Sequence, residues 1–272
     1  MKWNSLMSTP SHRKLAVVTG ASSGIGAVYA DRLAARGYDL LLIARRRDRL
    51  EEVAGRIASA HGRNAEILVA DLGDEADLAR VEKDLAARDD IELLVNNAGI
   101  ARFAPIAQAP ASDSAAQIAL NIGALTRLTH AVLPGFVARN RGTLVNIASI
   151  LSLHSLPHSA VYSGTKAYVL AFTRGLQSEL EGTAVKVQSV HPPATATEIW
   201  ELAGVPLASF DPEKIMTTEG MVDAALAGLA AGETITWPSV GDEALWATFD
   251  EARATLVAAS QTKNAAPRYA AA

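Results

Sequence analysis

The stretch LAVVTGASSGIG (15–26) decides the fold, because an apolar run enters a glycine-rich turn that is followed directly by a helical pattern. Its glycines are spaced GxxxGxG, which differs from the GxGxxG of the standard dinucleotide fingerprint. Glycine permits positive φ, close approach of a pyrophosphate and tight packing of the helix on the strand. The N-terminus of a helix also offers free amides to phosphate. The turn opens the first strand–helix unit and therefore predicts a dinucleotide site formed by Gly20, Ser22, Ser23, Gly24, Ile25 and Gly26.

Outward from this stretch, short apolar runs alternate with helix-length segments. The runs are mostly continuous rather than alternating, and they cover 15–19, 38–44, 65–70, 91–96, 142–148, 184–190 and 233–237. Helical patterns cover 24–36, 48–61, 75–88, 112–138, 160–181, 219–231 and 241–259. Continuous apolar runs are typical of strands that are covered on both faces. The alternation predicts an α/β fold with a doubly wound, Rossmann-like parallel sheet.

The length of 272 residues is compatible with one domain or two. No linker rich in Pro, Gly or Ser separates the runs, so we expect a single domain over 14–260. A flexible tail is expected over 1–13 and a second tail over 261–272. The proline-rich segment 191–214 follows the sixth strand at the edge where open sheets bind ligands. Because it also contains large apolar residues, we interpret about 192–215 as a partly ordered substrate lid.

Composition excludes several classes of protein. The 25 Lys and Arg against 29 Asp and Glu give a net charge of −4, which argues against a nucleic-acid partner. A chain without cysteine has no disulfide, thiolate nucleophile or zinc ribbon. His154 and His158 flank a proline, so no metal site is predicted. We see no apolar run long enough to span a membrane and no secretory signal in the first fourteen residues, and we therefore expect a cytoplasmic protein without a membrane partner.

The end of the second strand bears on the choice between NADP and NAD. An acid about twenty residues past the glycine loop would bind a ribose 2′-hydroxyl, but Asp39 opens this strand instead of closing it. The strand runs into Arg45, Arg46 and Arg47, and guanidinium groups suit the 2′-phosphate of NADP. We predict NADP as cofactor, held by Arg45 and Arg46, with NAD as the alternative. These arginines could also be the solvated start of the next helix.

Seven sequence pieces occur in an order that resembles the short-chain dehydrogenase/reductase family, from about residue 14 to 200. They are TGASSGIG (19–26), Asp71-Leu72, Asn96-Asn97-Ala98-Gly99, Asn121, Ser149, Tyr162-Ser163-Gly164-Thr165-Lys166 and Pro192…Thr197. A YxxxK pattern alone is common, but this order behind successive strands is specific. The family usually has glycine after the proline of the last piece. Here Pro193 removes an amide donor, so we expect a turn of altered shape.

The resemblance implies a catalytic set and a cofactor set. The catalytic residues would be Asn121, Ser149, Tyr162 and Lys166. Further cofactor contacts would come from Asp71, Leu72, Asn97, Ala98, Gly99, Tyr162, Lys166, Pro192, Thr195 and Thr197. The family also implies a homodimer or homotetramer, formed through the helices within 115–138 and 160–180.

The tyrosine and the lysine can be linked by their chemistry alone. Four residues apart on a helix, Tyr162 and Lys166 share one face. A phenol titrates near pH ~10, and a neighbouring ammonium favours the phenolate, so we expect Lys166 to lower the pKa of Tyr162. In reduction, hydride would pass from the nicotinamide to a carbonyl carbon while Tyr162 protonates its oxygen, and oxidation would reverse these steps. A structural alternative makes them an exposed pair, Ser149 a helix cap and Asn121 a buried amide.

Substrate identity rests on weaker signals. Candidate pocket residues follow Ser149, follow the fourth strand and lie in the lid, and most of them are apolar. This composition indicates an uncharged or hydrophobic small-molecule carbonyl/alcohol pair as substrate. The candidates are Leu151, Leu153, His154, Leu156, Ala101, Arg102, Phe103, Ile199, Trp200 and Leu202. A β-ketoacyl thioester reductase is one alternative, although its expected basic patch is not evident in Arg102, Arg139 and Arg141. A non-catalytic, NADP-sensing regulator is the other.

Overall fold

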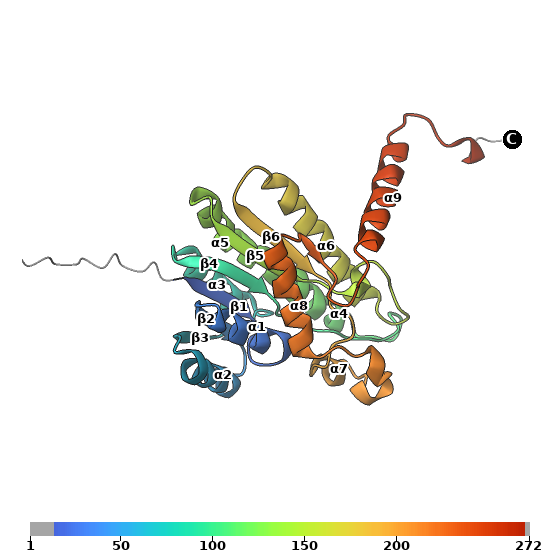
Figure 1. The fold of residues 1–272 in the computed structure, drawn as a ribbon. Coiled ribbons are helices and arrows are strands. Elements are labelled where there is room, and N and C mark those ends of the chain that lie inside the picture. The colour runs from blue at the N-terminus through green and yellow to red at the C-terminus, as the bar shows by residue number, and fades with distance from the viewer. Residues whose placement is uncertain (1–13, 270–272) are drawn as a thin grey trace, which may run out of the picture. The chain divides into compact units, whose positions relative to one another are not determined.

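One parallel sheet organises the protein, and the computed structural model describes residues 14–269 of the chain (Figure 1). Within these residues seven strands lie in the order β3-β2-β1-β4-β5-β6-β7, with every pair parallel. Their bounds are β1 (Leu15–Thr19), β2 (Asp39–Ala44), β3 (Ala65–Val69), β4 (Ile91–Asn96), β5 (Gly142–Ile147), β6 (Val185–Val190) and β7 (Ile235–Thr236). The predicted doubly wound α/β fold is confirmed.

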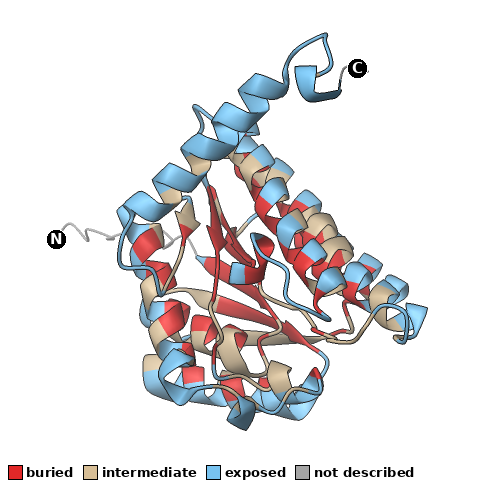
Figure 2. Ribbon diagram, turned by 90° about the vertical axis from the view of Figure 1, so that its right-hand side faces the viewer, coloured by how far each residue is buried: buried red, intermediate tan, exposed pale blue. Residues whose placement is uncertain are grey.

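Helices cover both faces of the sheet. One face packs against α1 (Gly24–Ala35), α2 (Arg47–His61) and α8 (Thr218–Ala231). The other packs against α3 (Glu75–Ala86), α5 (Leu125–Ala138) and α6 (Ala160–Glu179). Buried residues follow the strands and the helix sides that face them (Figure 2). This two-sided cover explains why the strands are continuous apolar runs.

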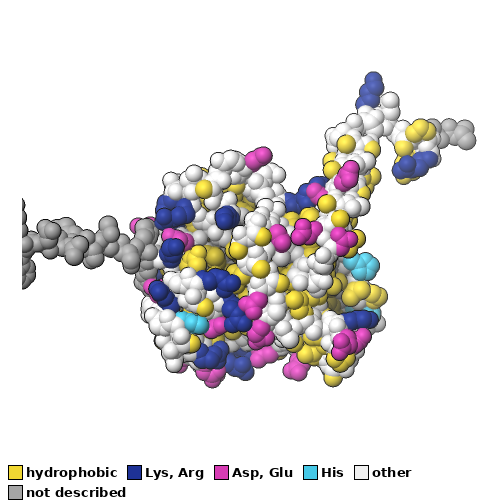
Figure 3. Space-filling model, in the orientation of Figure 1, with side chains coloured by type: hydrophobic (Ala, Val, Ile, Leu, Met, Phe, Trp, Pro, Cys, Tyr) yellow, Lys and Arg dark blue, Asp and Glu magenta, His cyan; other side chains and the backbone are white. Residues whose placement is uncertain are grey.

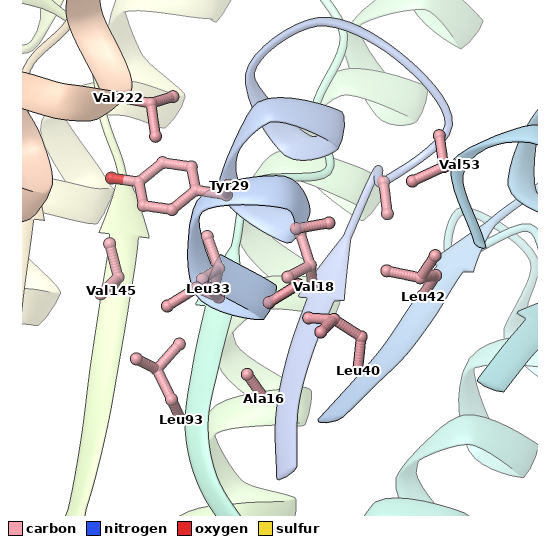
Figure 4. Packing of buried hydrophobic residues seen from close by; sticks show 14 of the residues in the cluster. Ala16, Val18, Tyr29, Leu33, Leu40, Leu42, Val53, Leu93, Val145 and Val222 are labelled. Atoms are coloured by element: carbon pink, nitrogen blue, oxygen red, sulfur yellow. The ribbon is translucent and has the colours of Figure 1, made fainter. Parts of the chain in front are cut away.

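The core beneath α1 is shown from close by in Figure 4. Tyr29 and Leu33 of α1 lie over Leu93 of β4 and Val145 of β5, and Val222 of α8 lies beside the Tyr29 ring. Leu40, Leu42 and Val53 extend the same apolar layer towards α2. These contacts hold α1, and with it the glycine turn that precedes it, against the carboxyl end of the sheet.

The strand order places the loops that matter at one edge. β1 is the first strand in the chain, and its neighbours β2 and β4 continue the sheet in opposite directions. Ligands of open α/β sheets bind at the carboxyl ends of the strands, at such a reversal of strand order. The loops after β1, β4, β5 and β6 therefore meet at this edge.

Two predicted elements differ in detail from the structure. The helix expected over 112–138 consists of α4 (Ala111–Ile118), a π-helical turn η1 (Ala119–Ala124) and α5. A π-turn widens the helix without changing the apolar pattern enough to be read from it. The strand expected over 233–237 is reduced to the two residues of β7, which pair with Ser189 and Val190.

The chain divides into two compact units at Pro238. The second contains α9 (Ala244–Ser260), in which no residue is buried and Trp246 stacks on Phe249 at 5.5 Å. The prediction of one domain over 14–260 included this helix and stays a prediction. Of the predicted tails, 1–13 and 270–272 lie outside the described residues, while 261–269 contain only the short turn η5 (Pro267–Tyr269).

Two features of the described residues bear on membranes and metal ions as partners. No helix within residues 14–269 has the length and apolar character needed to cross a membrane. In the same residues, no three His, Cys, Asp or Glu side chains are grouped as metal ligands. Over α1 and α2 the basic side chains, dark blue in Figure 3, are interspersed with acidic ones in magenta. The expected homo-oligomer stays a prediction.

Candidate active site

The glycine turn after β1 has the geometry that a pyrophosphate requires. Gly20 and Gly24 adopt φ of 67° and 53°, a region that disfavours other residues. A Cβ on Gly26 would lie 2.6 Å from Nδ2 of Asn97, so the helix can approach the loop only with glycine there. Ser23, the N-cap of α1, makes no side-chain capping bond and leaves the first amides of α1 without that partner. The turn therefore fits a dinucleotide phosphate.

Hydrogen bonds between Thr19, at the end of β1, and the loop after the neighbouring β4 support this turn. The Thr19 hydroxyl oxygen accepts hydrogen bonds from the amides of Asn97 and Ala98, both at 3.0 Å. The Asn97 side chain donates to the Thr19 carbonyl at 2.9 Å. The loop 97–99 is thus tied to the glycine turn, which places the predicted cofactor residues Ala98 and Gly99 beside it.

Two arginine side chains that follow β2 lie next to the serine hydroxyls of the glycine turn. Arg46 donates to the hydroxyls of Ser22 at 3.2 Å and Ser23 at 2.8 Å, and to Glu198 at 2.9 Å. Arg49 reaches the other Glu198 oxygen at 3.3 Å. The hydrogen bond from Arg46 is the main reason that the pKa of Glu198 lies below its ordinary value. The Glu198 carboxylate is thus the anion that these two arginines bind within the protein. The sequence analysis pointed to neither Glu198 nor Arg49.

Three other predicted cofactor residues differ in how exposed their side chains are. Arg45 lies 3.7 Å from the Asp71 carboxylate, and both side chains are exposed. Leu72 is buried in the hydrophobic core on the α3 face, among residues such as Leu78. Asp71 is thus accessible at this edge, while the Leu72 side chain packs inside.

Tyr162 and Lys166 share one face of α6, as predicted. The Lys166 ammonium lies 5.7 Å from the centre of the Tyr162 ring and donates to the Ile147 carbonyl at 2.8 Å. A hydrogen-bonding influence of the Ser149 side chain lowers the pKa of the Tyr162 phenol. The Ser149 oxygen also accepts from the Leu151 amide at 3.1 Å. The structural alternative of an exposed pair is wrong for Lys166, which is buried.

Burial dominates the acid–base properties of this pair. It raises the pKa of Tyr162 to about 12, and the Ser149 hydrogen bond opposes this shift only in part. It also lowers the pKa of Lys166 to about 8. The expectation that Lys166 would bring the Tyr162 pKa below its ordinary value is wrong, because desolvation of the phenolate is the largest influence and raises the pKa.

Asn121 lies in the π-helical turn η1 and clamps the loop after β4. Its oxygen accepts from the Ile100 amide and its nitrogen donates to the Ile100 carbonyl, both at 2.9 Å. The nitrogen also donates to Thr165 of α6 at 3.1 Å. A Cβ on Gly99 would approach both Asn121 Oδ1 at 3.2 Å and Lys166 Nζ at 3.7 Å. Asn121 and Lys166 therefore face the same narrow space.

The segment after β6 extends along the site from the catalytic residues to the glycine turn. Pro192 and Pro193 begin it, and Thr195 pairs with Met216 in a parallel bridge. A Cβ on Gly24 would lie 3.2 Å from the Thr197 methyl group, so Thr197 sits over the glycine turn. The segment includes α7 (Ile199–Leu202) and two short 3₁₀ turns. Its role as the substrate lid expected over 192–215 stays a prediction, and the name lid is kept for it below.

An aromatic row connects Tyr162 to this lid. Phe103 packs edge-on against Tyr162 at 5.6 Å between ring centres and is stacked with Trp200 at 6.1 Å. Trp200 in turn contacts Phe210 at 4.6 Å. Arg102 connects the loop after β4 to α7 by donating a hydrogen bond to the Leu202 carbonyl at 2.8 Å. Of the other candidate substrate residues, Leu153 and Leu156 are exposed while Leu151 is buried.

Comparison with known proteins agrees with this geometry. A family model described as short chain dehydrogenase matches residues 14–204, well over half of the chain. The chain belongs to the short-chain dehydrogenase family. The match covers the sheet up to β6 and every residue of the predicted catalytic set.

Solved structures of short-chain dehydrogenases resemble nearly the whole chain. One from Sphingobium yanoikuyae, in complex with NADPH, is 42% identical, covers 94% of this chain and 100% of its own, and superimposes with a TM-score of 0.90. A bulky-bulky ketone specific alcohol dehydrogenase from Comamonas testosteroni is 34% identical, with coverage of 96% and 100% and a TM-score of 0.87.

A curated relative differs in length. The very-long-chain 3-oxoacyl-CoA reductase of Anas platyrhynchos is 37% identical over 193 residues. This match includes 69% of the present chain, which spans 62% of the length of that relative.

Proposed function

We propose that this short-chain dehydrogenase is an NADPH-dependent reductase of bulky, uncharged ketones. One observation carries the proposal: the Lys166 ammonium lies over the Tyr162 ring, Ser149 lowers the pKa of the same phenol, and an aromatic row starts at this ring. This arrangement places a proton donor, a group that supports its charge and an apolar wall together.

NADP(H) is the proposed cofactor, and the chain's own residues support that choice. Gly20, Gly24 and Gly26 leave room for the pyrophosphate at the α1 N-terminus. Arg46, Ser22 and Ser23 form the set of donors that a 2′-phosphate needs, and the Arg46 guanidinium already pairs with the Glu198 carboxylate. When bound, the nicotinamide supplies the hydride. The relative from Sphingobium yanoikuyae, described with NADPH, supports the same assignment.

Proton delivery is the task of Tyr162. With a pKa of about 12, its phenol is protonated at neutral pH and donates from Oη to the substrate oxygen as negative charge develops there. The Ser149 oxygen accepts from the Leu151 amide, which leaves its proton for donation, to Tyr162 in the protein and to the same substrate oxygen during the reaction. Lys166, held by the Ile147 carbonyl, supports the phenolate that remains. A protonated tyrosine at neutral pH favours reduction over oxidation.

The aromatic row supports bulky, apolar substrates. Phe103, Trp200 and Phe210 form a continuous wall that starts at the Tyr162 ring. Aromatic walls orient flat or apolar groups by burying them and by offset or edge-on packing. The name of the Comamonas testosteroni relative, which specifies bulky-bulky ketones, is consistent with this substrate class.

Reduction of a 3-oxoacyl thioester is the second candidate, favoured by the name of the Anas platyrhynchos relative. The positions of Arg102, Arg139 and Arg141 argue against this function, because they do not form a basic patch for a charged acyl carrier. Arg102 is bonded to the carbonyls of Ala101 and Leu202. Arg139 donates to the Ile91 carbonyl and Arg141 pairs with Glu92, both at the amino end of β4, the edge opposite the active site.

A parallel assay separates these functions. Purified protein is mixed with NADPH or NADH and with a bulky aryl ketone, a small aliphatic ketone or a 3-oxoacyl-CoA, and nicotinamide absorbance is followed. We expect the highest kcat/KM with NADPH and the aryl ketone. A preference for the acyl-CoA would replace the proposed substrate, and tight NADPH binding without turnover of any carbonyl would indicate the regulator. Cytoplasmic location and homo-oligomeric assembly stay predictions.

A further inference from the structure

His191 is a buried histidine directly behind the catalytic residues, and no motif of the sequence pointed to it. It follows β6, has no exposed surface, and precedes Pro192 at the start of the lid. The adjacent backbone is joined to the loop after β5, because the Ile150 amide donates to the Pro192 carbonyl at 3.1 Å. His191 therefore lies where the strand that carries Ser149 meets the strand that carries the lid.

Both ring nitrogens of His191 have partners. Nδ1 lies 3.1 Å from the Ser149 carbonyl oxygen and 2.9 Å from the Ser152 hydroxyl. Nε2 lies 3.0 Å from the Ser189 hydroxyl. The ring also stacks on Trp237 with 4.1 Å between ring centres. A side chain with this many contacts has one orientation.

The contact with the Ser149 carbonyl points to one tautomer. A carbonyl oxygen only accepts hydrogen bonds, so this contact is a hydrogen bond only when Nδ1 carries the proton, and the hydroxyls of Ser152 and Ser189 can serve as donor or acceptor to fit it. The ring is neutral, because burial away from water lowers the pKa of His191 to about 4, with Lys166 as a charged neighbour acting in the same direction. A neutral Nδ1–H is a permanent donor to the backbone of Ser149 at working pH.

The neighbouring prolines make this donor more important. Pro192 and Pro193 have no backbone amide, so two consecutive residues cannot donate from the lid to the Ser149 loop. Their carbonyls only accept, from Ile150 and from the Thr195 hydroxyl at 3.0 Å. The imidazole of His191 is the donor that this junction directs at the carbonyl of Ser149 itself.

We propose that His191 is a positioning residue, which holds the Ser149 carbonyl through Nδ1–H and thereby keeps the Ser149 hydroxyl directed at Tyr162 and the substrate oxygen. The inference rests on the proposed function, because it assigns Ser149 to the reaction. His191 itself touches neither substrate nor cofactor. It acts through the backbone of the serine and joins that backbone to Trp237.

Three variants separate positioning from packing. His191→Leu keeps the volume and removes the donor, while His191→Asn restores an amide donor near the position of Nδ1. Ser189→Ala is the matched control, since it removes only the partner of Nε2. Each protein is checked for folding by circular dichroism, and its affinity for NADPH is measured by fluorescence titration, before ketone reduction is assayed.

We expect His191→Leu to lower kcat about 10- to 100-fold, the scale of a misplaced catalytic group. KM and the Kd for NADPH should stay within about twofold. His191→Asn should recover at least about fivefold of the lost kcat, and Ser189→Ala should remain within about twofold of wild type. Folded His191→Leu with unchanged kcat, or Asn and Leu variants with equal kcat, would overturn the proposal.

A measurement on the wild-type protein covers the case in which the leucine variant does not fold. Nitrogen NMR of histidine-labelled protein, assigned by loss of one signal in the asparagine variant, reports the tautomer of His191. We expect a neutral ring protonated at Nδ1 from pH 6 to pH 8. A proton on Nε2 would overturn the inference. If the wild type reduces no ketone, the proposed function fails, while the NMR result still tests the hold on Ser149.

Discussion

The two ends of the candidate active site are built in opposite ways. At the catalytic end, Asn121, Lys166 and His191 are buried, and their hydrogen bonds go to backbone carbonyls of Ile100, Ile147 and Ser149. At the phosphate end, Arg46 and Glu198 are both about two-fifths exposed, and they are held by a pair of opposite charges. The first set is buried in the fold, and the second lies in contact with water.

This difference separates chemistry from recognition. A buried donor that loses its partner costs about 1–3 kcal/mol, so the catalytic groups have one arrangement whether or not a ligand is bound. An exposed ion pair contributes about 0–1 kcal/mol, so Glu198 can give way to a ligand that carries more charge. We expect changes at the catalytic end to alter kcat and changes at the phosphate end to alter cofactor affinity.

The largest effect should come from Tyr162→Phe. This change removes the proton donor and leaves the ring that packs on Phe103, so kcat for ketone reduction should fall about 10²- to 10⁴-fold. Affinity for NADPH, measured by fluorescence titration, should stay within about threefold. A Tyr162→Phe protein that retains more than a tenth of the wild-type kcat would contradict the mechanism.

At the phosphate end, Arg46→Ala should change cofactor choice. Loss of a charged donor to a phosphate costs about 1.5–3 kcal/mol, so the Kd for NADPH should rise about 10- to 100-fold. The Kd for NADH, which lacks the 2′-phosphate, should change little. Arg63→Ala, at an exposed site between α2 and β3, is the control. Equal loss of affinity for both cofactors would show that Arg46 does not recognise the phosphate.

The pH dependence of reduction should reveal the buried lysine. Burial lowers the pKa of Lys166 to about 8, so above that pH the ammonium loses its proton and no longer supports the developing phenolate. The kcat for reduction should therefore be constant below about pH 8 and fall up to about tenfold per pH unit above it. A profile that stays flat to pH 10 would remove Lys166 from proton transfer. Stability should be monitored over the same range.

The smallest effect is expected from Glu198→Gln. Glutamine removes the negative charge that competes for Arg46 and Arg49, so affinity for NADPH should rise about two- to fivefold. Salt screens the competition, and the gain should shrink as ionic strength increases. Glu201→Gln, three residues on in α7, is the matched control. Weaker NADPH binding in the Glu198 variant would mean that the carboxylate supports the site instead of competing for it.

Much of the fold and of the site could be predicted from local pattern. Local sequence patterns are enough to predict the glycine turn, the continuous apolar strands and the shared helix face of Tyr162 and Lys166, because helices and parallel strands repeat regularly. Order along the chain then placed Asn121 and Ser149 beside them. These features depend on residues that are close in sequence or on strand ends that must meet.

The remaining features depend on contacts between distant segments. His191 lacks any motif, and its role arises only when β5, β6 and Trp237 come together. Glu198 is 152 residues from Arg46, so no spacing links them. The direction of the Tyr162 pKa shift was predicted wrongly because the charge of Lys166 is visible in the sequence, while the burial of the phenol is a property of the packed structure.

Proton donation by Tyr162 is tested most directly by comparing wild type with Tyr162→Phe under single-turnover conditions, with enzyme in excess over NADPH and a bulky aryl ketone present. We expect both proteins to bind NADPH with similar affinity, wild type to consume it rapidly, and the variant to do so at least about 100-fold more slowly. Equal rates of NADPH consumption would contradict the assignment of Tyr162 as the proton donor.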